Sequence, residues 1–332
     1  MGNHPGGIDN DNPYYHFCKI EAPYWVSNRS WRDSMSYRSS FSNRLQKIEE
    51  TEVCVAAVDM HIHLVDFLQQ TEGLPALLAE MGKTNVERAV IFGNPIKKKW
   101  LSSEPHRPAY YLDDDAVCYY YSATDEIVAS EYLKLSPEEA HQFAPTLCGF
   151  NPTDLCAIEY VDQMYSKYPF WKGIGELFLR HDDLTALTVS EPARVTHPAL
   201  RDIFAFCSEK NIPVCLHQNS TSVTHLHQFE YLHEMEQVLR DFPQTTFVWA
   251  HCGASTRVTG KNYAGMIDGM LHSWKNLYVD FSWVVFDDII TKNYRPKAAW
   301  LKLTEKYPDR IMIGSDLCGH FDVFGQIGRA HV

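Results

Sequence analysis

The sequence predicts an α/β fold, a (β/α)8 barrel of the TIM type, and three observations lead to that prediction. From Val53 onward, short apolar runs alternate with stretches of helical period, which is the pattern of βα units around a parallel sheet. Eight such runs can be counted within roughly 270 residues, a typical length for this barrel. Polar side chains follow several of the runs, and chemistry in such barrels lies at the carboxyl ends of the strands.

The predicted strands are short and mostly apolar, with polar residues or turn formers at their ends. In chain order they are Val53–Met60, Ala89–Phe92, Thr146–Phe150, Gly173–Phe178, Val214–His217, Phe247–Ala250, Leu277–Phe281 and Ile311–Gly314.

Helical periodicity occupies most of the intervals between these strands. The predicted helices are Leu74–Met81, Leu155–Tyr168, Pro198–Glu209, Phe229–Asp241, Tyr263–Trp274 and Pro296–Tyr307. In Phe229–Asp241 the apolar residues share one helix face, and they are Leu232, Met235, Val238 and Leu239.

The interval 94–143 is too long for a simple βα connection. It contains basic Lys97–Lys99, acidic Asp113–Asp115, aromatic Tyr119–Tyr121 and a helix start at Ser136–Glu139. Insertions of this size often cover active sites, so we expect either a lid over a substrate or a structural excursion from the barrel.

The two ends of the chain fall outside the predicted barrel. The aromatic residues in 1–52 indicate an arm that packs on the barrel or on a partner. The last six residues, Ile327–Val332, are what a widely used sequencing adapter encodes when read in frame, and Gln326 also fits. We therefore expect an artefact at 326–332 and a barrel at 53–325 that lacks its last helix, because the genuine sequence is interrupted near Gly325.

Composition excludes several classes of protein. With 45% hydrophobic residues among 332, the chain can bury a large core. The net charge of −12, without a basic block, argues against nucleic-acid or anionic membrane partners. Nine scattered cysteines form no Cys-x-x-Cys motif and suit a reducing compartment. With no signal peptide or spanning segment, we expect a soluble, cytoplasmic protein with a small-molecule substrate, and a homo-oligomer is compatible with the sequence.

Residues that could bind a metal follow five of the eight strands. They are His61 and His63 after the first, Glu176 in the fourth, His217 after the fifth, His251 after the sixth and Asp316 after the eighth. Side chains at i and i+2 of a strand point to the same face, so His61 and His63 can reach one ion. Each residue alone could be a hydrogen-bonded core residue, and a second His-x-His, at 225–227, is expected at the surface or in a lid.

The recurrence of these residues at strand ends favours a metal site. Two or three neutral imidazoles with a carboxylate suit Zn²⁺, Mn²⁺ or Fe²⁺ and leave a position for water. The ion can lower the pKa of that water to roughly 7, a nearby carboxylate can accept the proton, and an unligated histidine can polarise a substrate carbonyl.

The ordered motifs resemble the amidohydrolase superfamily, and more narrowly its amidohydrolase-related branch, which also contains aminocarboxymuconate-semialdehyde decarboxylase. The resemblance spans about 53–325. It rests on His61-Ile62-His63, Gly173-Ile174-Gly175-Glu176, His217, Ala250-His251-Cys252-Gly253 and Gly314-Ser315-Asp316. It implies a distorted (β/α)8 barrel that holds one divalent metal, usually zinc.

The resemblance also implies roles for individual residues. The metal ligands it implies are His61, His63, His217 and Asp316. It makes His251 the catalytic histidine, with Asp316 also a proton acceptor. Many members place a carboxylated lysine at the end of strand four to bridge two metals. The absence of such a lysine here favours a single ion. Glu176 could then bind the ion, orient another ligand or be only a polar residue at the end of the strand.

Three loop residues are candidates for contact with a substrate. Arg180 follows strand four and Arg257 follows the strand-six motif, and either could bind a substrate carboxylate through its bidentate fork. The alternative for both is a solvated loop arginine. Trp283, after strand seven, could line the pocket.

The function favoured by these observations is a metal-dependent hydrolase in which a metal-bound hydroxide attacks an amide, ester or lactone. The alternative is a non-oxidative decarboxylase of an unsaturated or aromatic carboxylate, since related enzymes use the same ligands for C–C cleavage. A barrel that only binds would need a disabled site, and no candidate position looks disabled. A dinucleotide motif at Gly173–Gly175 is excluded because Phe178 replaces its third glycine.

Overall fold

A computed structural model describes residues 57–322, apart from residues 85, 102, 104, 113, 183, 185–192, 226–227, 284 and 293–294. The expectations for the arm at 1–52, for the tail at 326–332 and for a missing last helix fall outside these residues. Within the described residues, every helix is too short or too polar to cross a membrane.

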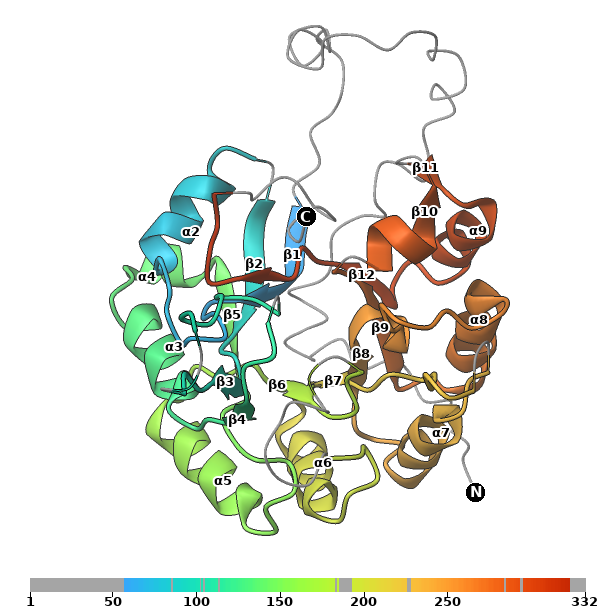
Figure 1. The fold of residues 1–332 in the computed structure, drawn as a ribbon, viewed down its shortest axis with the longest axis horizontal. Helices are drawn as coiled ribbons and strands as arrows, with labels where there is room; N and C mark the ends of the chain where they lie inside the picture. Colours follow the sequence, from blue (N-terminus) through green and yellow to red (C-terminus); the bar gives the residue numbers. More distant parts are fainter. Residues whose placement is uncertain are drawn as a thin grey trace, which may run out of the picture.

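Eight parallel strand positions form a ring at the centre of the structure (Figure 1). In ring order they are β1 (Ala57–His63), β2 (Val86–Phe92), β5 (Phe143–Leu147), β6 (Gly173–Phe178), β7 (Val214–His217), β8 (Phe247–Trp249), β9 (Leu277–Phe281) and the segment that contains β12 (Ile311–Ile313) and β13 (Leu317–Cys318). Each strand pairs in parallel with its neighbours, as repeated βα units require.

The segment 311–318 closes this ring. Its first half, β12, pairs with β9, where Ile311 lies opposite Val279. Its second half, β13, pairs with β1, where Leu317 lies opposite Ile62. The sheet order therefore begins and ends on one stretch of chain, and the predicted (β/α)8 barrel is confirmed.

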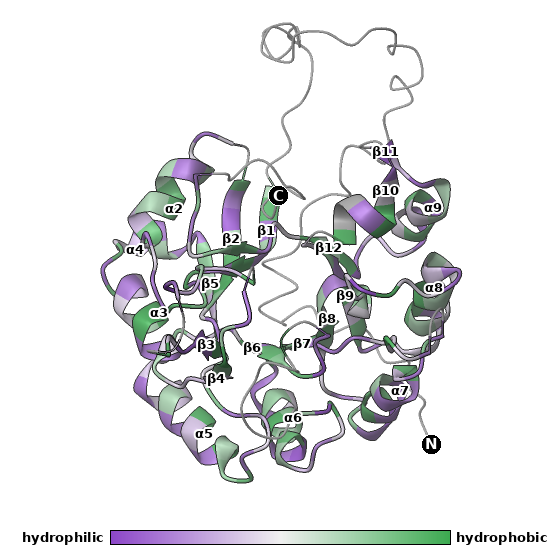
Figure 2. Ribbon diagram, viewed as in Figure 1, coloured by the Kyte–Doolittle hydropathy of each residue, from purple (hydrophilic) through white to green (hydrophobic). Residues whose placement is uncertain are grey.

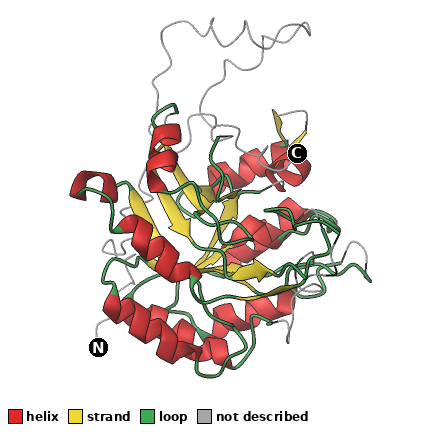
Figure 3. Ribbon diagram, turned by 60° about the vertical axis from the view of Figure 1, so that its left-hand side comes forward, coloured by secondary structure: helices red, strands yellow, loops and turns green. Residues whose placement is uncertain are grey.

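Seven helices of eight or more residues lie outside the strands in the described part of the chain (Figure 3). They are α2 (Leu74–Met81), α3 (Thr124–Tyr132), α5 (Ala157–Lys167), α6 (Ala199–Lys210), α7 (Leu232–Asp241), α8 (Tyr263–Ser273) and α9 (Ala298–Lys306). Hydrophobic and hydrophilic residues are interspersed along them (Figure 2), because one face packs on the barrel and the other meets solvent. On α7 the predicted face is buried at Met235, Val238 and Leu239, and Leu232 packs against it.

Several strand boundaries differ from the prediction: β2 begins at Val86 rather than Ala89, and β8 ends at Trp249 rather than Ala250. The third strand, β5, begins at Phe143 rather than Thr146, because Pro145 does not interrupt it: the Pro145 carbonyl accepts a hydrogen bond from the Lys172 N–H at 2.8 Å. The first strand continues through His63, so both histidines of the His-x-His motif belong to β1 itself.

The interval 94–143 supplies a crossover helix and a hairpin. The hairpin pairs β3 (Ile96–Lys98) with β4 (Cys118–Tyr120), and α3 is the helix between β2 and β5 that the sequence pattern did not reveal. The short helix α4 (Pro137–Ala140) begins at Ser136 with a capping box, as predicted. A second small hairpin, β10 (Thr291–Lys292) with β11 (Arg295–Pro296), follows the helical turn η6 (Phe286–Ile290) and precedes α9.

Candidate metal centre

Six of the predicted site residues converge at the carboxyl ends of the barrel strands, and all six are buried. They are His61 and His63 of β1, Glu176 of β6, His217 of β7, His251 of the turn η5 (Ala250–Gly253) and Asp316 between β12 and β13. Their potential ligand atoms form three overlapping groups, each within 4.8 Å: His61, His63 and Glu176; Glu176, His217 and His251; and His61, His251 and Asp316.

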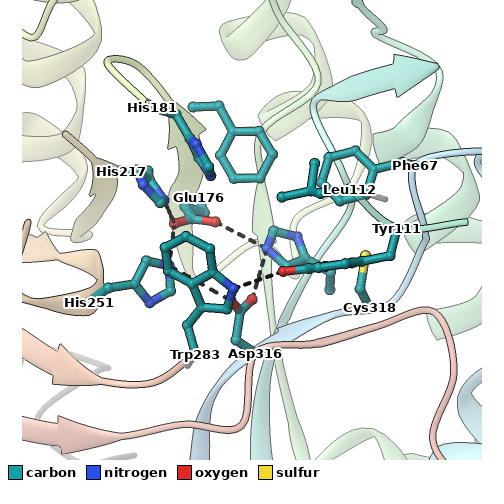
Figure 4. Close-up of a pocket in the computed structure, with 12 residues that line it drawn as sticks. Phe67, Tyr111, Leu112, Glu176, His181, His217, His251, Trp283, Asp316 and Cys318 are labelled. Atoms are coloured by element: carbon teal, nitrogen blue, oxygen red, sulfur yellow. Dashed lines mark hydrogen bonds and ion pairs between the residues drawn. The ribbon is translucent and has the colours of Figure 1, made fainter. Parts of the chain in front are cut away.

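Glu176 lies at the centre of this cluster (Figure 4). Its Oε2 is 3.0 Å from His63 Nε2, and its Oε1 is 3.2 Å from His217 Nδ1 and 3.4 Å from His251 Nε2. Gly175 permits this placement, because its φ is +112° and a Cβ there would collide with the Cys215 carbonyl. Burial opposes ionisation of Glu176, but the surrounding histidines outweigh it and hold the pKa well below its ordinary value.

The two histidines of β1 are anchored through Nδ1. His61 Nδ1 is 3.0 Å from Asp280 Oδ2, and His63 Nδ1 is 2.8 Å from the Gly93 carbonyl oxygen. Since both oxygens can only accept, both Nδ1 atoms carry the proton, and the Nε2 atom of each neutral ring is a lone pair directed into the cluster. This is the arrangement that orients histidine ligands around metal ions.

Both lone pairs face carboxylate oxygens, which cannot donate to them, and His63 Nε2 lies 3.0 Å from Glu176 Oε2. His61 Nε2 is without any hydrogen-bond partner. His61 Nε2 is fully buried, and it faces Glu176 Oε2 and Asp316 Oδ1, each at 3.4 Å. A lone pair against two carboxylate oxygens is repulsive unless a cation lies among them or the ring is protonated. Burial would lower the pKa of His61, but the carboxylates, Glu176 foremost, raise it well above its ordinary value. The same carboxylates therefore favour a positive charge at this position.

His251 is held by a chain of hydrogen bonds from β9. Its Nδ1 lies 2.8 Å from Ser282 Oγ, and the Ser282 hydroxyl donates to Asp280. Ser282 Oγ therefore accepts the Nδ1 proton of His251, which leaves Nε2 facing Glu176 and Asp316. Burial opposes the charged form of His251, but these acidic neighbours outweigh it and raise the pKa.

His217 differs from the other histidines because it presents an N–H to the cluster. Asn219 Nδ2 lies 3.2 Å from His217 Nε2. Two contacts determine the orientation of the Asn219 amide: its Oδ1 accepts the Asp182 N–H at 2.8 Å, and its Nδ2 donates to the Ala254 carbonyl at 2.6 Å. The proton of His217 is therefore on Nδ1, which donates to Glu176 Oε1 at 3.2 Å. To bind an ion through Nδ1, His217 would have to lose this proton.

Asp280 is a residue of the site that the strand-end argument missed. Besides His61, it accepts the His251 backbone N–H at 2.9 Å, and it is 1% exposed. The available signal was an acidic residue inside the apolar strand Leu277–Phe281, a position that only a buried partner explains.

A pocket of about 290 Å³, including its open mouth, lies over the cluster. Trp283 lines it, as the sequence suggested, and further walls come from residues without predicted roles: Phe67, Tyr111, Leu112, Phe178, His181 and Cys318. Tyr111 and Leu112 belong to the interval 94–143, and Trp283 Nε1 donates a hydrogen bond to Tyr111 Oη at 2.8 Å. This part of the insertion therefore covers the site.

His181 packs against the cluster from the end of β6. Its ring stacks on that of His217 with 4.0 Å between centroids and 19° between planes. Burial, with the charge of Arg257 among the smaller causes, lowers the pKa of His181 well below its ordinary value, so the ring is neutral at pH 7.

The two candidate arginines do not line this pocket. The Arg180 guanidinium is 2.9 Å from Asp182 Oδ1 and stacks 3.8 Å above the Tyr231 ring. Arg257 is exposed on the loop after η5. From the second His-x-His, His225 is exposed beside Glu230, as expected, and His227 lies outside the described residues.

In comparisons with known proteins, one family model matches part of this chain. The family model described as Amidohydrolase matches residues 176–319, which contain four of the six clustered residues. No curated protein matches the chain.

Several solved structures are similar to this chain. An uncharacterized TIM-barrel protein from Bordetella bronchiseptica is 16% identical, with 78% of this chain and 85% of that chain covered and a TM-score of 0.48. A 2,6-dihydroxybenzoate decarboxylase from Rhizobium is 13% identical, with 79% and 87% covered and a TM-score of 0.44. An amidohydrolase from Burkholderia multivorans with bound zinc is 11% identical, with 82% and 90% covered and a TM-score of 0.46.

Proposed function

We propose that this chain, whose residues 176–319 match the Amidohydrolase family model, is a metal-dependent hydrolase of the amidohydrolase superfamily that cleaves an amide, ester or lactone. The observation that carries the proposal is the buried His61 Nε2, which has no partner and faces two carboxylates at 3.4 Å. A divalent cation there would satisfy all three groups at once.

The side chains that fit one ion are those whose lone pairs already face the centre. His61 and His63 offer Nε2, and Glu176 and Asp316 offer carboxylate oxygens. This N/O donor set suits zinc, which we propose as the ion, with Mn²⁺ and Fe²⁺ as close alternatives. We propose His217 as a further ligand through Nδ1, in the tautomer that carries its proton on Nε2 instead. When bound, such an ion acts as a Lewis acid and lowers the pKa of a water molecule to about 7.

The chain itself would move the protons. Asp316 Oδ1 faces His61 and His63, whereas Oδ2 lies 3.8 Å from His251 Nε2. Asp316 can therefore take a proton from the attacking water and pass it toward His251. Protonated His251, whose charge Asp280 supports through Ser282, can polarise the substrate carbonyl and give the proton to the leaving group.

The test is the metal content of purified protein, compared with His61→Ala and Asp316→Asn. We expect close to one ion per wild-type chain and a large loss in both variants. His225→Ala is the matched control, because it removes an exposed histidine that pairs with Glu230 and should leave the content unchanged. Wild-type content in both site variants would refute the ligand assignment.

The reaction class is tested separately on the metal-loaded protein. Esters, lactones and amides should be cleaved with uptake of one water per turnover, and this activity should fall with the metal content of the variants. Release of CO₂ without addition of water would instead identify a decarboxylase, the alternative that the same ligand set permits.

A further inference from the structure

The walls of the pocket indicate which substrates the proposed hydrolase takes, and this inference rests on the proposed function. We propose that the substrate is a flat, uncharged ring compound, such as an aromatic ester or lactone, and that the pocket discriminates against rings that carry a carboxylate.

Aromatic side chains line the pocket, with Phe67 and Trp283 on different sides of it (Figure 4). Phe67 and Phe178 stack on one another, with 6.3 Å between ring centroids and 20° between planes. Across the pocket, the Trp283 indole lies 5.1 Å from the His251 ring and is fixed by its hydrogen bond to Tyr111 Oη. Rigid aromatic faces bind flat rings with little loss of conformational freedom, because few rotatable bonds must be ordered.

The charges beside these walls do not favour an anion. Glu176 and Asp316 line the pocket, and one divalent cation would bring their sum to about zero. A third carboxylate, Asp280, lies behind His61 at 3.0 Å and adds negative charge. A carboxylate on the substrate ring would therefore lose its hydration without gaining a compensating partner.

Two basic side chains near the pocket are held by other groups, and a third, the exposed Arg257, acts on His181 through its charge but does not line the pocket. Lys98 is 3% exposed, and its Nζ lies 3.0 Å from Asp114 Oδ1 and 3.3 Å from the Ala109 carbonyl. The Arg180 guanidinium is held between Asp182 and the Tyr231 ring. Both cations keep the loops around the pocket in place, so neither is positioned to accept a substrate carboxylate.

The experiment compares two esters of nearly the same shape on the metal-loaded protein, 4-acetoxybenzamide and 4-acetoxybenzoate. They differ only in whether the group opposite the scissile ester is neutral or anionic. We expect kcat/KM to be at least tenfold higher for the amide-bearing ester. Equal values, or a preference for the carboxylate, would overturn the proposal while leaving the hydrolase function intact.

A pair of variants at Leu112 tests whether the pocket causes the preference. Leu112→Arg places a cation in the lining, and Leu112→Gln is the uncharged control. The arginine variant should shift the ratio of the two kcat/KM values toward the carboxylate by tenfold or more, and the glutamine variant by less than threefold. An unchanged ratio in the arginine variant would contradict the proposed origin of the preference.

Binding separates failure of this proposal from failure of the proposed function. If neither ester is cleaved, calorimetry with the corresponding anilides, 4-acetamidobenzamide and 4-acetamidobenzoate, measures the preference without turnover. Tighter binding of the neutral anilide supports the substrate class even though the hydrolase function has failed. Equal binding, or no binding of either, overturns the substrate class as well.

Discussion

The substitution Asp280→Asn tests whether the barrel prepares His61 to bind the metal proposed above. Asp280 Oδ2 accepts the Nδ1 proton of His61 at 3.0 Å, while Oδ1 accepts the His251 backbone N–H at 2.9 Å. In the variant the amide oxygen can keep the backbone contact, so the amide nitrogen faces His61. Two donors then meet, and the His61 proton must move to Nε2, where it blocks the lone pair that faces the cluster.

The expected cost follows from this single displaced proton. Substitutions of groups that orient metal-bound histidines typically lower metal affinity about 10–100-fold, which corresponds to roughly 1.4–2.7 kcal/mol. A buried hydrogen bond to a charged group contributes about 1.5–3 kcal/mol, so the contact is strong enough to account for the loss.

The measurement is competition for zinc between the protein and a chelator of known affinity. Asp268→Asn is the matched control, because it makes the same chemical change on α8, where the carboxylate pairs with Lys306 near the surface. We expect affinity within twofold of wild type for the control and a loss of 10–100-fold for Asp280→Asn. An Asp280→Asn protein that folds and binds zinc as tightly as wild type would refute the tautomer argument.

Three further predictions concern the insertion, a buried carboxyl group and the metal. Lys98→Met releases the loop that carries Tyr111, so it should raise KM several-fold while kcat stays within twofold of wild type. The same change should lower the free energy of unfolding by about 1–3 kcal/mol. An unchanged KM in steady-state assays would contradict this prediction. Burial raises the pKa of Asp125 to about 6 from an ordinary 3.8. The group therefore contributes about 3 kcal/mol to the free energy of unfolding below pH 3.8, and this contribution is lost as the pH rises through 6. Urea unfolding at pH 4 and pH 7 should show this loss in wild type but not in Asp125→Asn, and equal pH dependence would exclude the assignment. Zinc at 100 times its Kd should stabilise the protein by about 2.7 kcal/mol and raise Tm by roughly 4–5 °C over chelated protein. An unchanged Tm in calorimetry would count against a metal site.

The strand ends could be predicted from the sequence because two signals coincide there. An apolar run such as Val214–Leu216 identifies a buried strand, and a polar residue directly after it, such as His217, must lie at the rim of the barrel. In a closed ring all these strand ends lie at the same end of the barrel, so one sequence pattern predicts both the fold class and the cluster of polar residues.

Contacts made by loops could not be predicted in this way. Tyr111 reaches the pocket from a loop whose path is determined by Lys98 and Asp114, a tertiary contact without local periodicity. Arg180 lies two residues after the end of β6, yet the direction of its side chain depends on Asp182 and on Tyr231, which is distant in sequence. Sequence position identifies which residues are near the barrel rim, but it does not determine which way a long side chain turns.

The way the ring of strands closes affects when, during synthesis of the chain, the proposed metal site can be complete. Asp316 lies in the short stretch between β12 and β13, where its backbone N–H donates to the His61 carbonyl at 2.8 Å beside the pairing of β13 with β1. A nascent chain that has emerged only as far as β9 carries the histidines but lacks this carboxylate. We therefore expect stable zinc retention to begin only once the eighth strand has docked, so that metal uptake reports completion of the barrel.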